Sequence, residues 1–492
     1  MAERPTVMSR GEKSAEAEVA AGRGRRAERG GVFKAKSMLN ATRQMSAPAE
    51  RVGVAHGEAE GEPASDEANN PRQDTESTGS ALLAAALTRQ NLRQAFKRVR
   101  VNKGAAGVDG LDIDQTARQL VTAWPTLREQ LLQGTYRPSP VRRVTIPKSE
   151  GGERELGIPT VSDRIAQTVA KEVLEPILEP VFHVDSYGYR PGKSAREALG
   201  VARRRCWRSD WVLELDIRSF FDNLDHARLL DMLRRHTDCK WVLLYVERWL
   251  KAPVQMEDGS LMARDKGTPQ GGCISPILSN LFLHYCFDAW MQEHFRSIPF
   301  ERFADDAICH CKTRAQAQYL RAELERRFAQ YHLELHPQKT RVVYCQDDDR
   351  RGDYPEHSFD FLGYTFRPRR SKNRWGKFFV SFTPAVSNKA AKAMRQTLRS
   401  WSLQNRSDKS LEDLARMFNP VIRGWINYYA GFYKSALYPT LRHIDRSLSL
   451  WATRKYKKLR RHRRRAEHWL VRVARVRPTL FAHWRLVRPQ AG

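Results

Sequence analysis

The chain has 492 residues, which is enough for about two to four domains with sizeable cores. Its formal net charge is +29, and residues 367–492 hold +26 of it, with 31 Lys and Arg against 5 Asp and Glu, so a polyanionic partner is expected, nucleic acid before a membrane surface. No run approaches the roughly 18 consecutive apolar residues of a transmembrane helix, and the charged N-terminus has no signal-peptide core, so we expect a cytoplasmic protein without a membrane partner.

The N-terminal third is expected to contain an extension, a helix and a β-hairpin. Residues 1–80 are rich in Ala, Glu, Gly, Arg and Ser without a sustained period, which predicts a disordered extension. A helix is expected to begin at Ala81 and to continue through Val99, because its apolar residues recur at helical spacing. Residues 144–158 predict a β-hairpin that presents Lys148 and Arg154, with a solvated basic turn as the alternative.

Residues 186–195 follow a helix expected over Asp163 to Leu178. They include Gly192-Lys193-Ser194, but the position five before Gly192, where a phosphate-binding P-loop needs glycine, is Tyr187. A P-loop is therefore excluded. Arg190 and Lys193 are interpreted as contacts to a nucleic-acid template, and structural salt bridges are the alternative.

Two apolar strands are expected to deliver three carboxylates. Asp216 ends the strand that begins at Trp211, and Asp305 and Asp306 lie at or beside the turn of a hairpin over 301–308. If Asp305 and Asp306 are considered without Asp216, an exposed acidic turn would be enough to explain them. Three carboxylates from neighbouring strands could instead hold two Mg²⁺ ions about 3.5 to 4 Å apart, which suits in-line displacement at a triphosphate.

Several candidates flank these strands. Either Phe220 or Phe221 should face the site while the other packs in the core, because side chains alternate. Gln270 lies in a loop over 267–276 that enters a helix, and Lys339 follows an amphipathic helix expected from Arg314 to Tyr331. We interpret Asp222, His226 and Arg302 as structural.

The basic C-terminal quarter is expected to be helical. Ser410-x-x-Asp413 resembles a capping box that opens a helix bent at Pro420. Further on, nine of the twelve residues 454–465 are basic, which favours phosphate binding over a merely solvated charge run. These nine are Arg454, Lys455, Lys457, Lys458, Arg460, Arg461, Arg463, Arg464 and Arg465.

Three of these stretches resemble the palm motifs of reverse transcriptases. They are L-E-L-D-I-R-S-F-F at 213–221, T-P-Q-G-G-C-I-S-P at 268–276 and F-A-D-D at 303–306. The closest resemblance, from about residue 81 to the C-terminus, is to the proteins encoded by bacterial group II introns, whose maturase block is similar to 419–429. Phe303 stands where that family usually has Tyr, and it keeps an aromatic ring beside the carboxylates.

The resemblance implies an α/β (α+β) right-hand polymerase. The implied domains are a disordered extension at 1–80, fingers and palm at 81–370, an all-helical thumb or maturase domain at 371–450, and a basic DNA-binding tail at 451–492. Residues 478–484 resemble the DNA-binding tail of intron proteins. No HNH endonuclease domain follows, so second-strand cleavage is not expected from this chain.

The resemblance also implies residue roles. Asp216, Asp305 and Asp306 would be the catalytic ligands of two Mg²⁺ ions. Lys148, Arg154, Phe221, Gln270 and Lys339 would contact the incoming nucleotide, with Phe221 excluding a ribose 2′-hydroxyl and Lys339 protonating pyrophosphate. The nucleic-acid contacts would be Arg190, Lys193, Arg423, Asn427, Tyr429 and the nine basic residues of 454–465.

The implied function is RNA-directed DNA synthesis coupled to intron splicing and mobility. Its partners would be group II intron RNA, a DNA target and primer, and dNTPs, at the bacterial nucleoid, and a homodimer is compatible with it. One alternative is a reverse transcriptase from a retron, a diversity-generating element or a defence system. Another is a splicing-only RNA-binding protein with an inactive polymerase, which the intact carboxylates and Gln270 disfavour.

Overall fold

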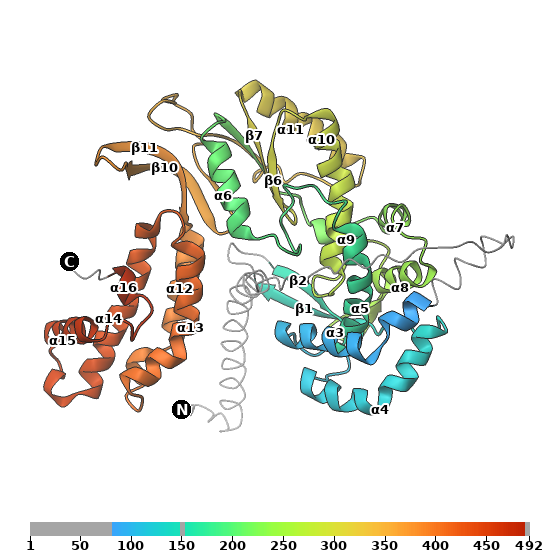
Figure 1. The fold of residues 1–492 in the computed structure, drawn as a ribbon, viewed down its shortest axis with the longest axis horizontal. Helices are drawn as coiled ribbons and strands as arrows, with labels where there is room; N and C mark the ends of the chain where they lie inside the picture. Colours follow the sequence, from blue (N-terminus) through green and yellow to red (C-terminus); the bar gives the residue numbers. More distant parts are fainter. Residues whose placement is uncertain (1–80, 148–152, 488–492) are drawn as a thin grey trace, which may run out of the picture. The chain divides into compact units, whose positions relative to one another are not determined.

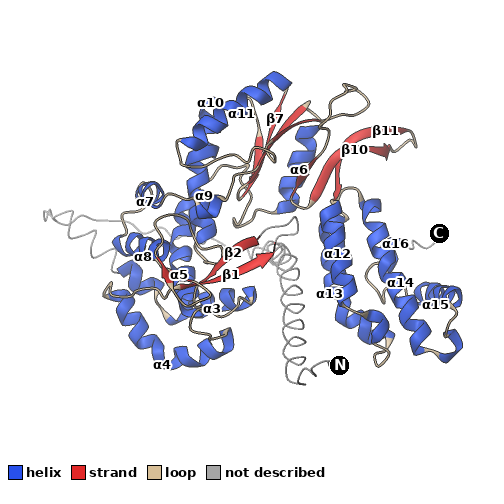
Figure 2. Cartoon of the chain, turned by 180° about the vertical axis from the view of Figure 1, so that it is seen from behind, coloured by secondary structure: helices blue, strands red, loops and turns tan. Residues whose placement is uncertain are grey.

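The computed structural model describes residues 81–147 and 153–487, which form two compact units (Figure 1). Of these residues, the first unit comprises 81–147, 153–198 and 211–342, and the second comprises 199–210 and 343–487. Both contain helices and strands, which confirms the predicted mixed α/β class (Figure 2). None of the helices in these ranges is long and apolar enough to cross a membrane.

The first unit begins with helices around a small sheet. Residues 81–86 are helical, but the expected continuous helix is broken because Thr88 caps a separate helix. The sheet has the order β2-β1-β4-β5, and β1 pairs with β2 as the predicted antiparallel hairpin, whose tip lies outside the described residues. The elements are α3 (Arg89–Asn102), α4 (Ile113–Leu132), β1 (Val141–Pro147), β2 (Glu153–Ile158), α5 (Val161–Leu178), α8 (Lys240–Lys251), β4 (Val254–Gln255) and β5 (Leu261–Met262).

A second sheet of the first unit carries the predicted carboxylates. Its order is β6-β7-β3-β8, and α11 packs against β3 and β7. The strands are β3 (Trp211–Leu215), β6 (Phe300–Phe303), β7 (Asp306–Cys311) and β8 (Arg341–Tyr344), and the boundary between the units falls within β8. Around them lie α7 (His226–Arg234), α9 (Ser275–Leu283), the π-helical η2 (His284–Asp288), α10 (Ala289–His294) and α11 (Arg314–Ala329).

The second unit joins a three-stranded sheet to a helical bundle. The sheet order is β11-β10-β9, with β9 (Phe359–Phe361), β10 (Tyr364–Lys372) and β11 (Phe378–Val386). The predicted capping box of Ser410 and Asp413 is present at the start of α13. The helices are α6 (Ala195–Cys206), which the unit boundary divides, α12 (Asn388–Ser400), α13 (Leu411–Tyr429), α14 (Tyr438–Lys455), α15 (Arg463–Val476) and α16 (Trp484–Val487).

The expected domain boundaries do not fall between elements. The boundary at 370 lies inside β10, and the boundary at 450 lies inside the continuous helix α14. The region after 370 is also not all-helical, because β11 pairs with β10 along nine residue pairs. The abrupt rise in basic residues at Arg367 therefore marks one strand of a hairpin, where a change of charge had predicted a change of domain.

Candidate active site and nucleic-acid interface

The three predicted carboxylates come together at one end of the β6-β7-β3-β8 sheet. Asp305 occupies the tight turn between β6 and β7, and Asp306 is the first residue of β7. The antiparallel register of β3 against β7 pairs Leu215 with Ala307, so Asp216 and Asp306, each one residue further, lie side by side. Each strand is short and buried, and each delivers its carboxylate as the chain emerges toward solvent.

The charges around Asp305 are unevenly balanced. Burial raises the pKa of its carboxyl above the ordinary value, and the negative charge of Asp216 adds to the rise. Arg154 and Arg302 oppose it by stabilising the ionised form. Because burial and a neighbouring carboxylate both disfavour the ionised form of Asp305, a bound cation would be stabilised there.

Lys339 reaches the same cluster, with its Nζ 3.5 Å from Oδ2 of Asp216. The chain around it is fixed by the backbone, because the His336 amide donates to the Asp216 carbonyl at 2.8 Å and Leu335 forms a β-bridge with Ile217. The structure therefore places the expected proton donor beside the expected metal ligands, although these residues are far apart in sequence.

Replacing Lys339 with Gln is expected to lower kcat for nucleotide addition about a hundredfold with little change in KM, because a general acid commonly contributes 10² to 10⁴ in rate. Single-turnover primer extension measures this directly. Lys339→Arg is the discriminating control, since it keeps a positive charge near Asp216 but its guanidinium does not release a proton. Full rescue by Arg would show that Lys339 acts by charge alone.

Arg154 and Gln270 are also brought together. The Arg154 Nε donates to Gln270 Oε1 at 2.6 Å, and the Gln270 amide donates to Asp222 Oδ1 at 3.3 Å. The loop that carries Gln270 passes so close to β2 that a Cβ on Gly271 would lie 2.4 Å from the carbonyl oxygen of Gly157. A side chain at position 271 would collide with β2, so this close approach of the loop requires glycine.

The other two predicted nucleotide contacts have different outcomes. Phe220 is 2% exposed and packs in the core, whereas Phe221 is half-buried. Both residues lie in a 3-10 helix, Phe220–Asp222, and not in a strand, so the strand alternation on which the expectation rested is not the cause of this difference. Phe221 as the ribose-excluding residue stays a prediction. Lys148 lies outside the described residues, so its predicted contact also stays a prediction.

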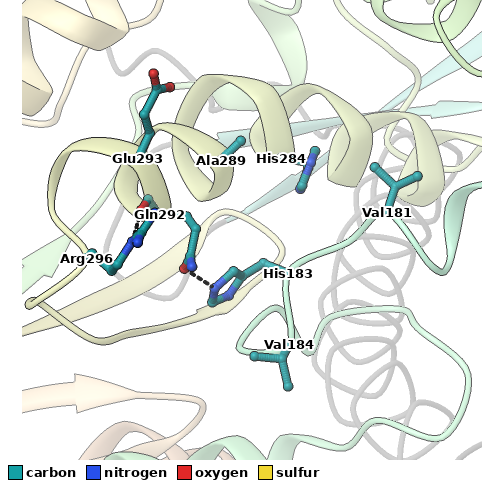
Figure 3. A pocket seen from close by; sticks show the side chains of 8 residues that line it. All are labelled: Val181, His183, Val184, His284, Ala289, Gln292, Glu293 and Arg296. Atoms are coloured by element: carbon teal, nitrogen blue, oxygen red, sulfur yellow. Dashed lines mark hydrogen bonds between the residues drawn. The ribbon is translucent and has the colours of Figure 1, made fainter.

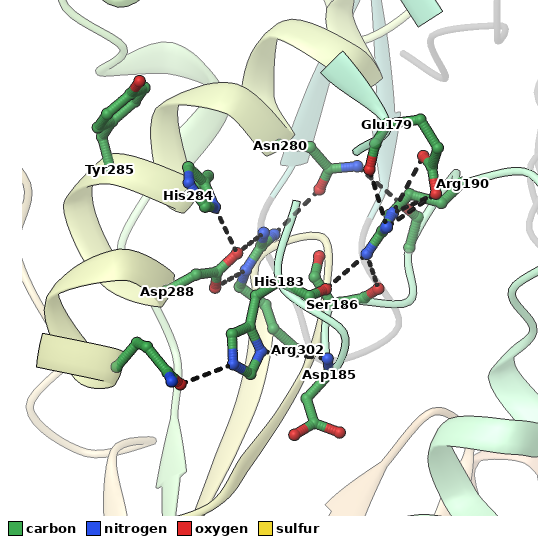
Figure 4. A network of polar contacts seen from close by, with 12 residues as sticks. Glu179, His183, Asp185, Ser186, Arg190, Asn280, His284, Tyr285, Asp288 and Arg302 are labelled. Carbon is green, nitrogen blue, oxygen red and sulfur yellow. Dashed lines mark hydrogen bonds and ion pairs between the residues drawn. The ribbon is translucent and has the colours of Figure 1, made fainter. Parts of the chain in front are cut away.

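A buried polar network around Arg302 supports the acidic hairpin, which is the β6–β7 hairpin that carries Asp305 and Asp306 (Figure 4). Arg302 is 1% exposed and makes a two-pronged ion pair with Asp288, at 2.7 and 2.5 Å. Its remaining guanidinium nitrogen donates to Asn280 Oδ1 and to the Ala304 carbonyl in the turn, both at 3.0 Å. The interpretation of Arg302 as structural agrees with this burial.

The same network extends to the loop at 186–190. The Asn280 amide donates to the Gly188 carbonyl at 2.7 Å, and a Cβ on Gly188 would lie 2.4 Å from the Ala304 backbone nitrogen. Sequence reasoning missed Asn280, Asp288 and Gly188 as parts of the site. A charged residue in an apolar strand signals that a buried partner exists, but it does not say which carboxylate supplies it.

The donor set fits a divalent cation in kind, but it does not form a closed cage. Across 81–147 and 153–487, no group of three or more His, Cys, Asp or Glu side chains is gathered closely enough to hold an ion. Mg²⁺ commonly takes one or two carboxylates and completes its shell with water and substrate phosphates, so an open arrangement suits it. Lys339 meanwhile supplies positive charge to Asp216.

The structure corrects the predicted role of Arg190. It was interpreted as a template contact, but its side chain is 7% exposed and pairs with Glu179 at 2.7 Å. It also donates to the carbonyls of His183 and Ser186, at 2.6 and 2.7 Å, so it is committed to holding its own loop. Lys193 is half-buried and donates to a backbone carbonyl at 2.9 Å, and its template contact stays a prediction.

The predicted nucleic-acid contact of Tyr429 is also corrected, because this residue is 7% exposed and does not face solvent. Its ring lies 5.3 Å from that of Tyr364, and its hydroxyl leaves no room for a Cβ on Gly363. This burial raises the pKa of Tyr429 to about 12. Arg423 and Asn427, on the same helix, are exposed and remain candidates for RNA contact.

The basic block over 454–465 lies on the surface as predicted. Eight of its nine cations are exposed, and Lys455 is half-buried, donating to the Ser407 carbonyl at 2.7 Å. Arg454 hydrogen-bonds to Asn405, and Arg463 pairs with Glu467 at 3.2 Å. The exposed guanidinium and ammonium groups outnumber these local partners, so the surface can bind phosphates.

The segment predicted as a DNA-binding tail is packed against the bundle. Phe481, His483 and Trp484 are each at most 1% exposed, and both His483 and Trp484 hydrogen-bond to Asp445 of α14. The buried Asn419 of α13 fixes the backbone of the same segment. Its side chain donates to the Leu480 carbonyl at 2.8 Å and accepts from the Ala482 amide at 2.9 Å. These aromatic side chains complete a core and are not available to DNA.

A pocket of about 550 Å³ lies on the first unit but contains none of the predicted site residues (Figure 3). Its lining includes His183, His284 and Arg296, and His183 makes a 3.1 Å hydrogen bond with Gln292. The carboxylates lie outside this pocket, at one end of the β6-β7-β3-β8 sheet.

Comparisons with known proteins identify a polymerase region and a maturase region in this chain. Residues 146–366 match the family described as reverse transcriptase (RNA-dependent DNA polymerase), and residues 391–469 match the group II intron, maturase-specific domain. The chain is 32% identical to Protein YkfC of Escherichia coli (strain K12), over 59% of this chain and 84% of that protein.

It is also 35% identical to the group II intron-encoded protein LtrA of Lactococcus lactis subsp. cremoris, over 39% of this chain and 32% of LtrA. A third relative is the putative COX1/OXI3 intron 1 protein of Saccharomyces cerevisiae, 30% identical over 34% of this chain and 20% of that protein. The matches to these two relatives thus span a third or less of their lengths.

The reverse transcriptase match contains all three carboxylates, Gln270 and Lys339, and the maturase match contains α13, α14 and the basic block. Reverse transcriptases use divalent metal ions, for which these carboxylates are suitable donors. With its polymerase and maturase regions in one chain, the protein belongs to the family of group II intron-encoded reverse transcriptases and maturases.

Proposed function

We propose that this chain binds the RNA of its own group II intron, assists the splicing of that RNA and copies it into DNA during intron mobility. The observation that carries the polymerase part is the meeting of Asp216, Asp305 and Asp306 at one sheet end, with Lys339 3.5 Å from Asp216. Incoming dNTPs and a DNA primer on an RNA template are the corresponding substrates.

Two Mg²⁺ ions held by the three carboxylates would neutralise the triphosphate and activate the primer 3′-hydroxyl. The protein side chains would supply the rest. Arg154, held by Gln270, would contact the phosphates, and Lys339 would protonate the departing pyrophosphate. Phe221 would lie against the sugar and disfavour a 2′-hydroxyl.

The RNA part of the proposal rests on the second unit. Arg423 and Asn427 are exposed on α13, and eight exposed cations of the basic block follow. Contacts of this kind bind phosphates without reading sequence, so recognition of the DNA target would come mainly from base pairing by the intron RNA. Such a protein would act where RNA and DNA meet, at the nucleoid.

The test is extension of a DNA primer on an RNA template at one fixed salt concentration. Wild type should extend the primer only when Mg²⁺ is present, and Asp216→Asn should lose at least about a thousandfold in rate, since metal-ion stabilisation supplies several kcal/mol. Absence of synthesis by the wild type, with tight RNA binding retained, would overturn the polymerase assignment and favour a splicing-only protein.

A further inference from the structure

The β10–β11 hairpin presents a group of exposed aromatic rings at its distal end. Trp375 is 74% exposed, Phe378 54% and Phe379 39%. Soluble proteins seldom leave rings of this size clustered in solvent unless they meet a partner, because burying them is strongly favourable. Neither the catalytic carboxylates nor the basic block includes these residues.

The hairpin divides into a buried base and a free end. β9 pairs with β10 only at residues 364–366, and the facing residues of β11 are buried. Beyond that point the two strands continue as a ribbon with exposed side chains on both faces. The register pairs Lys372 with Phe378 and Ser371 with Phe379, so the two phenylalanines lie on opposite faces.

The turn at the free end has a defined hydrogen-bonded geometry. The Asn373 side chain accepts hydrogen bonds from the backbone nitrogens of Trp375 and Lys377, at 3.0 and 2.9 Å. Gly376 adopts a φ of +85°, a conformation that glycine takes without strain. The backbone of Trp375 therefore belongs to a defined turn, which reduces the backbone ordering that binding a partner would require.

The charge of the same segment indicates what the partner is. Residues 367–380 contain six Lys and Arg and no Asp or Glu. The Arg370 guanidinium lies 4.1 Å from the centre of the Phe378 ring, and that of Arg374 lies 4.1 Å from the Trp375 ring. One carboxylate from a neighbouring loop, that of Asp348, reaches the ribbon, where it accepts from the Val380 amide at 2.9 Å.

Cations beside exposed ring faces match single-stranded nucleic acid. Each unpaired base can stack on a ring or a guanidinium plane while its phosphate contacts the adjacent cation. A duplex hides the faces of its bases, so it could use only the cations. Because the maturase-specific region begins a few residues after β11 in the same unit, RNA is favoured over DNA.

We propose that the free end of the β10–β11 hairpin is a binding site for single-stranded RNA, in which bases stack on Trp375 and Phe378 and phosphates contact Arg370 and Arg374. This site lies outside the set of residues that performs nucleotide addition, and its existence does not depend on polymerase activity.

The first test is equilibrium binding of a short unstructured RNA and of a blunt RNA duplex to the full chain. Trp375→Ala/Phe378→Ala should weaken single-strand binding about tenfold or more, in line with the loss of stacked bases, and should change duplex binding less than twofold. Tyr319→Ala is the matched control, because Tyr319 is a 58% exposed aromatic on α11 and should have no effect.

Salt dependence separates stacking from charge. The aromatic double variant should keep the wild-type slope of log affinity against log salt, whereas Arg370→Gln/Arg374→Gln should reduce the slope by about 1.4, which corresponds to two lost contacts on a single strand. Thermal unfolding should be unchanged in both variants, because the replaced side chains are exposed.

Ultraviolet cross-linking gives a readout that other RNA-binding surfaces of the chain do not obscure. Cross-links of the short RNA should map to residues 374–379 and disappear in the aromatic double variant. The proposal is overturned if no cross-link maps there, or if single strands and duplexes lose equal affinity. The same binding measurement is made with single-stranded DNA and with vesicles that contain anionic phosphatidylserine. The proposal is also overturned if the aromatic double variant loses affinity only for one of these two ligands and not for single-stranded RNA.

Discussion

An Asp305→Ala/Asp306→Ala protein is expected to lose RNA-templated DNA synthesis by at least about a thousandfold and to keep its ability to promote splicing. Synthesis fails because the turn and the first residue of β7 no longer supply oxygen ligands, and metal-ion stabilisation is worth several kcal/mol. Splicing persists because the proposed RNA contacts, Arg423, Asn427 and the basic block, belong to the second unit.

Primer extension and the splicing rate of a precursor RNA, measured on the same protein preparation, test the two halves of this expectation. Asp231→Ala/Glu247→Ala is a matched control, because it also removes two carboxylates from the first unit, on α7 and α8. Splicing that fails in the Asp305→Ala/Asp306→Ala protein while its RNA affinity is normal would show that the two activities are not separable.

The carboxylates could be predicted from sequence because their placement depends on local rules. A short apolar strand that ends in Asp, and a tight hairpin turn with Asp beside it, fix where Asp216, Asp305 and Asp306 emerge once the strands pair. The capping box at Ser410 is equally local and was also predicted. Such features require only the neighbouring residues of the chain.

The errors concern side chains whose surroundings come from distant segments. Tyr429 could be placed on a helix, but its burial depends on Gly363 in the turn between β9 and β10 and on Tyr364 at the start of β10. From the sequence, Arg190 could equally have been a template contact or part of a salt bridge. In the structure it pairs with Glu179 and donates to two backbone carbonyls. Sequence spacing does not tell which of several acids reaches a given base.

The free ribbon of β10 and β11 was missed for a different reason. The excess of Lys and Arg from Arg367 onward suggested a domain boundary near residue 370, and no hairpin was predicted across that boundary. Pro368 and Pro384 also interrupt the two runs of strand-forming residues, and a proline within such a run weakens the strand signal. Its exposed aromatic rings become informative only when their accessibility is known.

Arg302 is expected to be the positioning residue with the largest effect on catalysis. Arg302→Met should lower the free energy of unfolding by about 3 to 5 kcal/mol, because the buried Asp288 would lose both of its guanidinium hydrogen bonds. The turn that holds Asp305 would also lose its support, since Arg302 donates to the Ala304 carbonyl at 3.0 Å. Urea unfolding and steady-state primer extension measure the two effects.

A double variant separates these effects. Arg302→Met/Asp288→Leu removes both charges, so most of the lost stability should return, because apolar replacements of a buried ion pair are often neutral. The Ala304 carbonyl and Asn280 would still lack their donor, so kcat should remain about tenfold or more below wild type while KM for dNTP and RNA affinity change little.

The comparison pair for this experiment is Arg350→Met/Asp347→Leu, which removes a partly buried ion pair from the second unit. It should alter stability but leave kcat at the wild-type level, because neither residue touches the acidic hairpin. If Arg302→Met/Asp288→Leu recovers kcat together with stability, the network contributes to folding alone, and the geometry of the Asp305 turn is set by the strand register of β6 and β7 without help from the guanidinium.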